Sequence, residues 1–156
     1  MTDASILRRL RALHGERAAT RATRTGARWL TGMRWVAAGI FLGFGVTKFA
    51  DHAVELASFR HYPLPAAGLF VYLVGALEIG GGLLLAAGLL TRLAALALAA
   101  DMIGAVVVSG LARGEVISLT LAPLLLVAMI ILIRFGAGAW SLDGWLADRA
   151  ATSDQP

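Results

Sequence analysis

The stretch from Pro65 to Leu89 most constrains this chain, because it is apolar almost throughout and carries one charged residue, Glu78, near its middle. A helix needs about 20 apolar residues to cross a hydrocarbon core of about 30 Å, and this stretch is longer than that. A buried helix of a soluble protein rarely stays apolar for so long. The stretch therefore predicts a membrane-spanning helix with a carboxyl group near mid-depth.

A carboxyl group at that depth is costly, by about 3 kcal/mol on insertion scales, so Glu78 is expected to face protein or water instead of lipid. The composition agrees with a membrane domain: 58% of the 156 residues are hydrophobic and only 15% are charged. A soluble domain has about 25% charged residues. The absence of cysteine excludes a disulfide or a thiol nucleophile within this chain.

Three further apolar runs predict an all-α fold, a four-transmembrane-helix bundle. We expect a membrane domain over residues 29–146, with spans at about 30–53, 64–90, 92–112 and 116–136.

Local features refine these spans. Pro63 and Pro65 mark the start of the second span, since proline suits a first helical turn. Gly39 and Gly43 form a GxxxG pair at which another helix could approach closely. Pro123 is expected to kink the fourth span, with the hydroxyls of Ser118 and Thr120 near enough to satisfy freed backbone groups.

The basic residues predict how the chain lies in the membrane. Four spans put both termini on one side, and of the 14 Lys and Arg residues all but Lys48, Arg60 and Arg113 fall on that side. The excess predicts that both termini lie in the cytoplasm. The expected location is the bacterial cytoplasmic (inner) membrane, as a multi-pass protein. The basic excess gives no indication of nucleic-acid binding.

The two ends of the chain are expected to lie outside the bundle. Residues 1–28 form a basic cytoplasmic or interfacial arm, which is either a helix on anionic lipid headgroups or a solvated, partly disordered segment that enforces orientation. Residues 147–156 are expected to be a disordered tail.

Four charged residues are candidates for a ligand-binding or proton site inside the bundle: Glu78, Lys48, Arg34 and Asp101. Arg34 and Lys48 share one stripe of the first span. A rise of about 1.5 Å per residue puts Lys48, Glu78 and Asp101 in the middle third of the membrane. Glu78 is therefore predicted to pair with Lys48 or to hydrogen-bond Asp101, and one of the two acids is expected to hold a proton at neutral pH.

Two interpretations of this cluster remain open. It is either a polar clasp that fixes helix register or a site for a proton or a quinone headgroup. The histidines do not suggest haem, since His52 and His61 lie at one outer loop and His14 on the opposite side. A metal site of His52, Asp51, Glu55 and His61 would have no recognised spacing, so no metal is predicted. No catalytic residue is assigned.

Three segments carry a family resemblance: RWVAAGIFLGFGVTKF from Arg34, ALEIGGGLLLAAGLLTR up to Arg92, and GAGAWSLD up to Asp143. In this order they resemble the DoxX family of small four-helix membrane proteins, over about Arg34 to Leu146. Ala137 departs from the proline often found between the two glycines of the last segment. The family takes its name from the small subunit of a thiosulfate:quinone oxidoreductase, so the resemblance implies a membrane subunit that works with a quinone and a redox partner. It does not extend to Asp101.

The leading functional hypothesis is an integral membrane subunit of a quinone-linked redox system, with a polar intrahelical site around Glu78. No intrinsic cofactor is expected, quinone is the candidate ligand, and the expected partners are membrane lipids and a protein of redox metabolism. The alternative is a non-catalytic membrane anchor or assembly factor for redox proteins. A small proton-coupled transporter ranks third, because four short helices give little room for alternating access.

Overall fold

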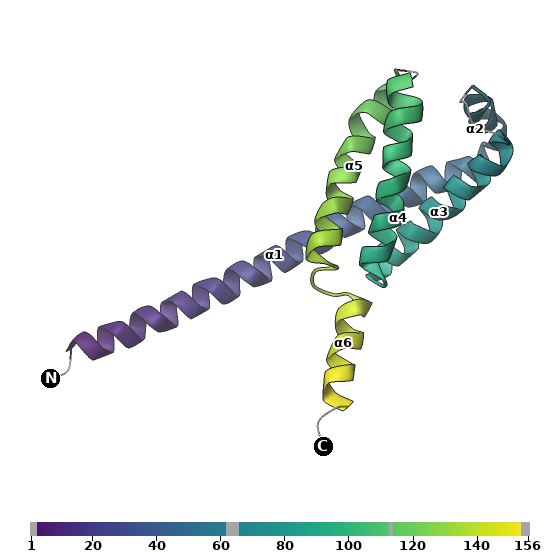
Figure 1. Ribbon diagram of the computed structural model, residues 1–156. Helices are drawn as coiled ribbons and strands as arrows, with labels where there is room; N and C mark the ends of the chain where they lie inside the picture. The colour runs from purple at the N-terminus through teal and green to yellow at the C-terminus, as the bar shows by residue number, and fades with distance from the viewer. Residues whose placement is uncertain (1–2, 62–65, 113, 154–156) are drawn as a thin grey trace.

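The computed structural model describes residues 3–61, 66–112 and 114–153, with side chains placed for 25–61, 66–112 and 114–149. Within these ranges the chain is helical and contains no strand. The elements in chain order are α1 (Asp3–Ala50), α2 (His52–Phe59), α3 (Ala67–Ala87), α4 (Thr91–Gly104), the π-helix η1 (Ala105–Leu111), α5 (Val116–Phe135) and α6 (Leu142–Ser153) (Figure 1). The residues expected to begin the second span, Pro63 to Pro65, lie outside the described ranges.

Four of these helical stretches are long and apolar enough to cross a membrane: Thr25–Ala50, Ala67–Ala87, Thr91–Leu111 and Val116–Phe135. Their outward faces are apolar too, since Leu69, Leu83, Leu96 and Leu124 are each more than half exposed. In a soluble protein such side chains would be buried, whereas lipid solvates them. The all-α fold with four membrane spans is therefore confirmed.

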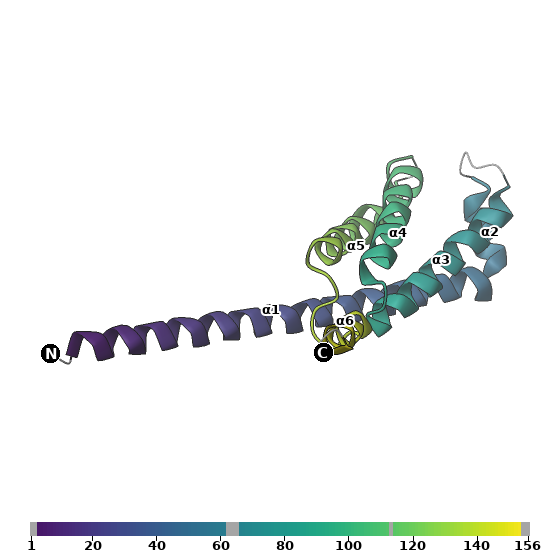
Figure 2. The same ribbon diagram turned by 60° about the horizontal axis from the view of Figure 1, so that its bottom comes forward.

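The spans pack as two antiparallel pairs. Helix α1 packs along α3, and α4 with η1 packs along α5, while α3 and α4 also contact each other after a short turn (Figures 1 and 2). Leu85, Leu98, Met129 and Leu132, which are fully buried, form the core where the pairs meet. This core lies toward the end of the bundle at which α6 is attached, and it leaves the α2 end less tightly filled.

Glycines allow α1 and α3 to approach closely. A Cβ on Gly45 would lie 3.0 Å from both the Gly75 carbonyl oxygen and the Ile79 nitrogen of α3. Gly39 and Gly43, in contrast, have nothing within 4 Å of a Cβ, so no described helix uses the close approach that this pair would allow. The contacting glycine of α1 lies two residues after Gly43, on a different face of the helix.

Both ends of the chain are helical where the structure describes them. Helix α1 begins at Asp3, so the backbone of residues 3–28 continues the first span as one helix and extends away from the bundle (Figure 2). Helix α6 continues to Ser153 and includes residues 147–153, for which the sequence predicts disorder. Alanine-rich sequence favours helix there. Residues 154–156 lie outside the described ranges.

Helix α5 continues through Pro123, and the nearby hydroxyls bond differently from what we expected. Thr120 donates to the Val116 carbonyl at 2.7 Å, and Ser118 donates to Glu115 Oε2 at 3.2 Å. Proline at 123 leaves the carbonyl of residue 119 without its helical donor. Neither hydroxyl meets that carbonyl, so both stabilise the beginning of the helix instead.

Candidate functional site

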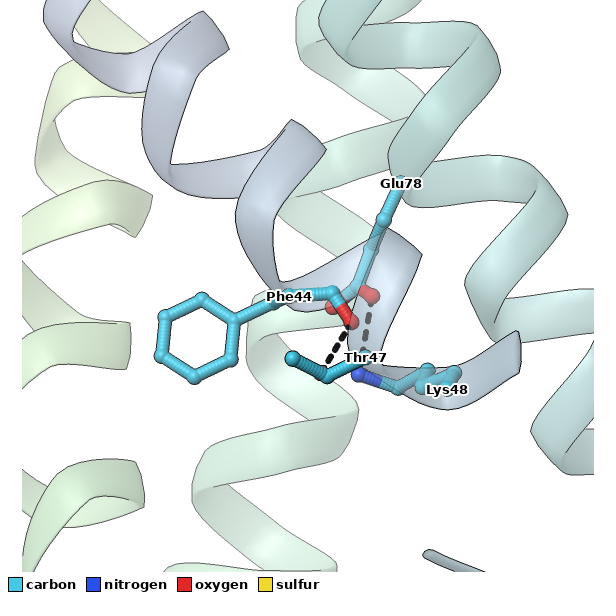
Figure 3. A network of polar contacts seen from close by, with 4 residues as sticks. All are labelled: Phe44, Thr47, Lys48 and Glu78. Carbon is cyan, nitrogen blue, oxygen red and sulfur yellow. Dashed lines mark hydrogen bonds and ion pairs between the residues drawn. The ribbon is translucent and has the colours of Figure 1, made fainter. Parts of the chain in front are cut away.

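A buried ion pair joins α1 to α3. The Lys48 ammonium nitrogen lies 2.8 Å from Oε2 of Glu78 (Figure 3). Lys48 is 8% exposed and Glu78 is 4% exposed. Since Lys48 Cβ packs beside Gly75, three residues before Glu78, the close approach of the two helices brings these side chains together. Of the two partners suggested for Glu78 by helix depth, Lys48 is the one that forms the contact.

Lys48 also lies near an aromatic ring of its own helix. Its ammonium nitrogen lies 5.9 Å from the centre of the Phe44 ring, which is within cation–π range. Figure 3 shows the Phe44 ring directed away from Glu78, while the neighbouring Thr47 hydroxyl donates to the Phe44 carbonyl at 2.8 Å. The hydroxyl of Thr47 is therefore engaged by its own helix, and the acceptor for Lys48 comes from α3.

A cavity of about 470 Å³ lies beside the ion pair, between the α1–α3 and α4–α5 pairs. This volume is within the range of about 300–1,000 Å³ that is usual for small-molecule sites. Most of its wall is apolar, including four phenylalanines. Its charged lining residues are Lys48, Glu55, Glu78, Asp101 and Glu115, and its aromatic ones are Phe41, Phe44, Phe59 and Phe70.

Asp101 reaches this cavity from α4, on the opposite wall from the ion pair. Its Oδ2 atom is buried and has no hydrogen-bond partner among the described residues. Buried polar atoms in proteins are nearly always hydrogen-bonded to protein or to ordered water. An unpaired carboxyl oxygen facing a cavity is therefore available to a ligand or to water.

Arg34 does not join this cluster, contrary to the expectation that it shares a site with Glu78. Its side chain is fully buried near the other end of the bundle, where Nη2 donates to the Trp140 carbonyl at 2.9 Å. The shared helical stripe does align Arg34 with Lys48, but at about 1.5 Å per residue the two lie about 21 Å apart along α1. Arg34 thus helps to hold the segment before α6 against α1.

Asp143 completes this second polar cluster, and reasoning from the residues alone gave it no role. Its carboxylate accepts hydrogen bonds from the backbone N–H groups of Leu90 at 2.7 Å and Thr91 at 3.0 Å. Burial raises the pKa of Asp143, but the hydrogen bonds from Thr91 and Leu90 outweigh burial and hold this pKa below the usual range of a carboxyl group. Asp143 therefore caps α4 from a distant part of the chain.

His52 packs against an aromatic ring. The His52 ring stacks on Tyr72 of α3, with 4.3 Å between ring centres and 14° between planes. In the part of the chain that the structure describes, no group of three His, Cys, Asp or Glu residues is arranged to hold a metal ion.

The sequence also left Glu55 and Glu115 out of the candidate site, although both line the cavity. Glu55 comes from α2, and Glu115 directly precedes α5. The sequence does show that Glu55 and Glu115 each lie next to a span, on the side of the membrane opposite the basic termini. This position could be interpreted only once α2 and α5 were known to border one cavity.

Four apolar spans, with an ion pair and a cavity between them, define a small helical integral membrane protein. Residues 29–111 match the DoxX family model, and the chain belongs to the DoxX family. It is 34% identical over 129 residues to "Uncharacterized membrane protein Rv3486" of Mycobacterium tuberculosis, which covers 71% of this chain and 77% of that protein. No solved structure matches the chain.

Proposed function

We propose that this protein is the membrane subunit of a quinone-linked redox system and that the cavity beside Glu78 holds the quinone headgroup. The observation that carries the proposal is a cavity of about 470 Å³ whose wall is mostly apolar but which is also lined by the Lys48 ammonium and by the carboxyl groups of Glu78 and Asp101 from the middle of their spans. A quinone headgroup has the matching chemistry, with a flat apolar ring and two carbonyl oxygens that accept hydrogen bonds.

The residues can be given distinct roles in this site. The Lys48 ammonium can donate to one quinone carbonyl, and the phenylalanine rings of the wall can pack against the quinone ring. Reduction of a quinone to a quinol adds two electrons and two protons, one proton to each carbonyl oxygen. Glu78 and Asp101 are the groups that can pass these protons, and a redox partner protein supplies the electrons.

Neutral variants of the two deep acids test the proposal. Glu78→Gln and Asp101→Asn should each slow quinone-dependent electron transfer in membranes by about 10²-fold or more, the contribution typical of a general acid. Rates are compared at equal amounts of membrane-inserted protein. Asp51→Asn is the matched control, since this exposed acid lies outside the cavity lining and its replacement should leave the rate unchanged. Unchanged rates in both site variants would remove the acids from the mechanism.

A non-catalytic anchor or assembly factor is the second candidate, and the position of the ion pair favours it. Lys48 and Glu78 connect the two helices that pack most closely, so the pair could serve only to fix their register. Exchanging the two residues, Lys48→Glu with Glu78→Lys, separates the candidates. A register clasp would be restored by the exchange, with normal partner recovery, whereas quinone chemistry would stay impaired because the charges have changed places.

We further propose that both termini lie in the cytoplasm of a bacterium, with α2 on the outer side of the inner membrane. The basic residues around the N-terminal end of the first span support this orientation. Reporter fusions at the C-terminus and after Phe59 should give opposite signals, and the C-terminal fusion should report the cytoplasm. A periplasmic signal at the C-terminus would reverse the orientation.

A further inference from the structure

The cavity reaches the α2 end of the bundle. Glu55, Ser58 and Phe59 of α2 line it on one side, and Glu115 with Ser118 lines it at the beginning of α5. Ser58 and Glu115 are exposed, so these lining residues connect the cavity with the surface at that end. Glu78 and Asp101 lie deeper, on the middle parts of their spans.

The opposite end is closed by tightly packed apolar side chains. Leu85, Leu98, Met129 and Leu132 have no exposed surface. A Cβ on Gly81 would lie 2.8 Å from Leu98 Cγ, so no space remains between α3 and α4 one turn below Glu78. Water therefore has a lined route to the deep acids from the α2 end and none through this core.

The charges along the cavity are strongly unequal. Four carboxyl groups line it, those of Glu55, Glu78, Asp101 and Glu115, so even with one of the two mid-span acids protonated they outnumber the single ammonium of Lys48. That ammonium is already paired with Glu78 at 2.8 Å. A cleft with one sign of charge and apolar walls concentrates counter-ions and can change association rates by about 10–10³-fold. An acidic lining of this kind favours cations over anions.

We propose that the cavity is a cation-selective vestibule open only at the α2 end, through which hydronium ions reach Glu78 and Asp101. The unpaired Oδ2 of Asp101 is the buried acceptor at its deep end, and the hydroxyls of Ser58, Ser109 and Ser118 are polar groups along the route. The use of these protons to make quinol rests on the proposed function. The access route and its charge selection do not.

The absence of cysteine makes this proposal directly testable, because a single introduced thiol is the only one in the chain. Ser109→Cys in η1 places a thiol in the cavity, and Ser118→Cys provides a second cavity position if the first variant folds poorly. The probes are two membrane-impermeant methanethiosulfonates of similar size, one carrying trimethylammonium and one carrying sulfonate. Each is added to one side of sealed membranes, and the labelling rate is measured.

Two further single-cysteine variants provide the references. Ala57→Cys on α2 is exposed and outside the cavity lining, so it gives the rate ratio of the two reagents at the same membrane face. Ala147→Cys on α6 is exposed at the other end of the bundle and shows which side each reagent has reached.

The cavity thiol should react only from the side that labels Ala57→Cys. Relative to that reference, its ratio of cationic to anionic reagent should be higher by about tenfold or more. Adding Glu55→Gln and Glu115→Gln should reduce this excess severalfold. The vestibule would be ruled out if the ratio of cationic to anionic labelling at the cavity thiol equalled that at Ala57→Cys. Labelling of the cavity thiol from the side that reaches Ala147→Cys would also rule it out.

These results do not depend on quinone. A normal labelling pattern without quinone-dependent activity would support the vestibule and reject the redox proposal. Quinone-dependent activity that requires Glu78 would retain the quinone site. Combined with equal labelling by the two reagents, or with labelling from the side that reaches Ala147→Cys, it would reject the vestibule.

Discussion

Lys48 and Glu78 join α1 to α3 through a single ion pair, with an Nζ–Oε2 distance of 2.8 Å and side chains that are only 10% and 5% exposed. Breaking such a pair leaves an uncompensated buried charge, which destabilises proteins by about 3–5 kcal/mol. Lys48→Met should lower the free energy of unfolding in detergent by about this amount. Adding Glu78→Leu should recover most of it, because the stranded carboxylate is then removed. Additive losses in the double variant would show that the two residues act independently.

Gly45 and Gly43 provide a matched test of the α1–α3 contact. Gly45→Ala would bring a methyl group to 3.0 Å from backbone atoms of Gly75 and Ile79, which cannot move without shifting α3. Overpacking of this kind costs about 1–3 kcal/mol. Gly43→Ala meets nothing within 4 Å, so it should be neutral or slightly stabilising. Thermal unfolding of the two variants should therefore differ in sign, and a similar loss at both positions would contradict this packing.

Asp143 should make the stability of the chain depend on acid pH. Its folded pKa is lower than its unfolded value of about 3.9, so its contribution is fully present above that value and is lost as the pH falls through the folded pKa. Asp143→Asn should lower stability at pH 7 by about 0.5–2 kcal/mol, the usual effect of losing a helix cap. Melting temperatures of the two proteins, measured from about pH 7 to pH 2.5, should converge in acid. A difference in melting temperature that stays constant across this pH range would show that the Asp143 carboxylate is not the source of the stabilisation.

Gly88 and Gly114 have similar left-handed backbones but different surroundings. Their φ angles are +66° and +69°, yet a Cβ on Gly88 would collide with the Arg34 guanidinium and approach Ser141 Cβ at 2.7 Å. Nothing lies within 4 Å of a Cβ on Gly114. Both alanine variants bear the backbone strain of about 1 kcal/mol, but Gly88→Ala should also displace Arg34 and be the more destabilising by about 1–3 kcal/mol. Equal melting temperatures would contradict the packing of Arg34.

Hydrophobic run length was sufficient to predict the four spans, because lipid imposes a minimum length on any helix that crosses it. Depth along the spans also gave Lys48 and Asp101 as the two candidate partners of Glu78, and the structure pairs Glu78 with Lys48. Both predictions depend on distances along single helices, which the sequence determines directly through the rise per residue.

Contacts between distant segments could not be derived in this way. The sequence does not reveal that Asp143 returns to cap α4, since this requires the path of the chain after α5. For the same reason a shared helical stripe suggested one site for Arg34 and Glu78, whereas Arg34 bonds the Trp140 carbonyl. The choice of Gly45 over Gly43 likewise depends on how the helices are rotated against each other.

The π-helix η1, Ala105–Leu111, has a consequence for comparing this chain with its relatives. A π turn contains more residues than an α turn, so it corresponds to an inserted residue within an otherwise regular span. A helical wheel drawn from Asp101 at 3.6 residues per turn therefore assigns residues after Gly104 to the wrong face of the span. Homologues that lack the π turn should align with a one-residue gap inside this span and should present a differently shaped wall to the same acids.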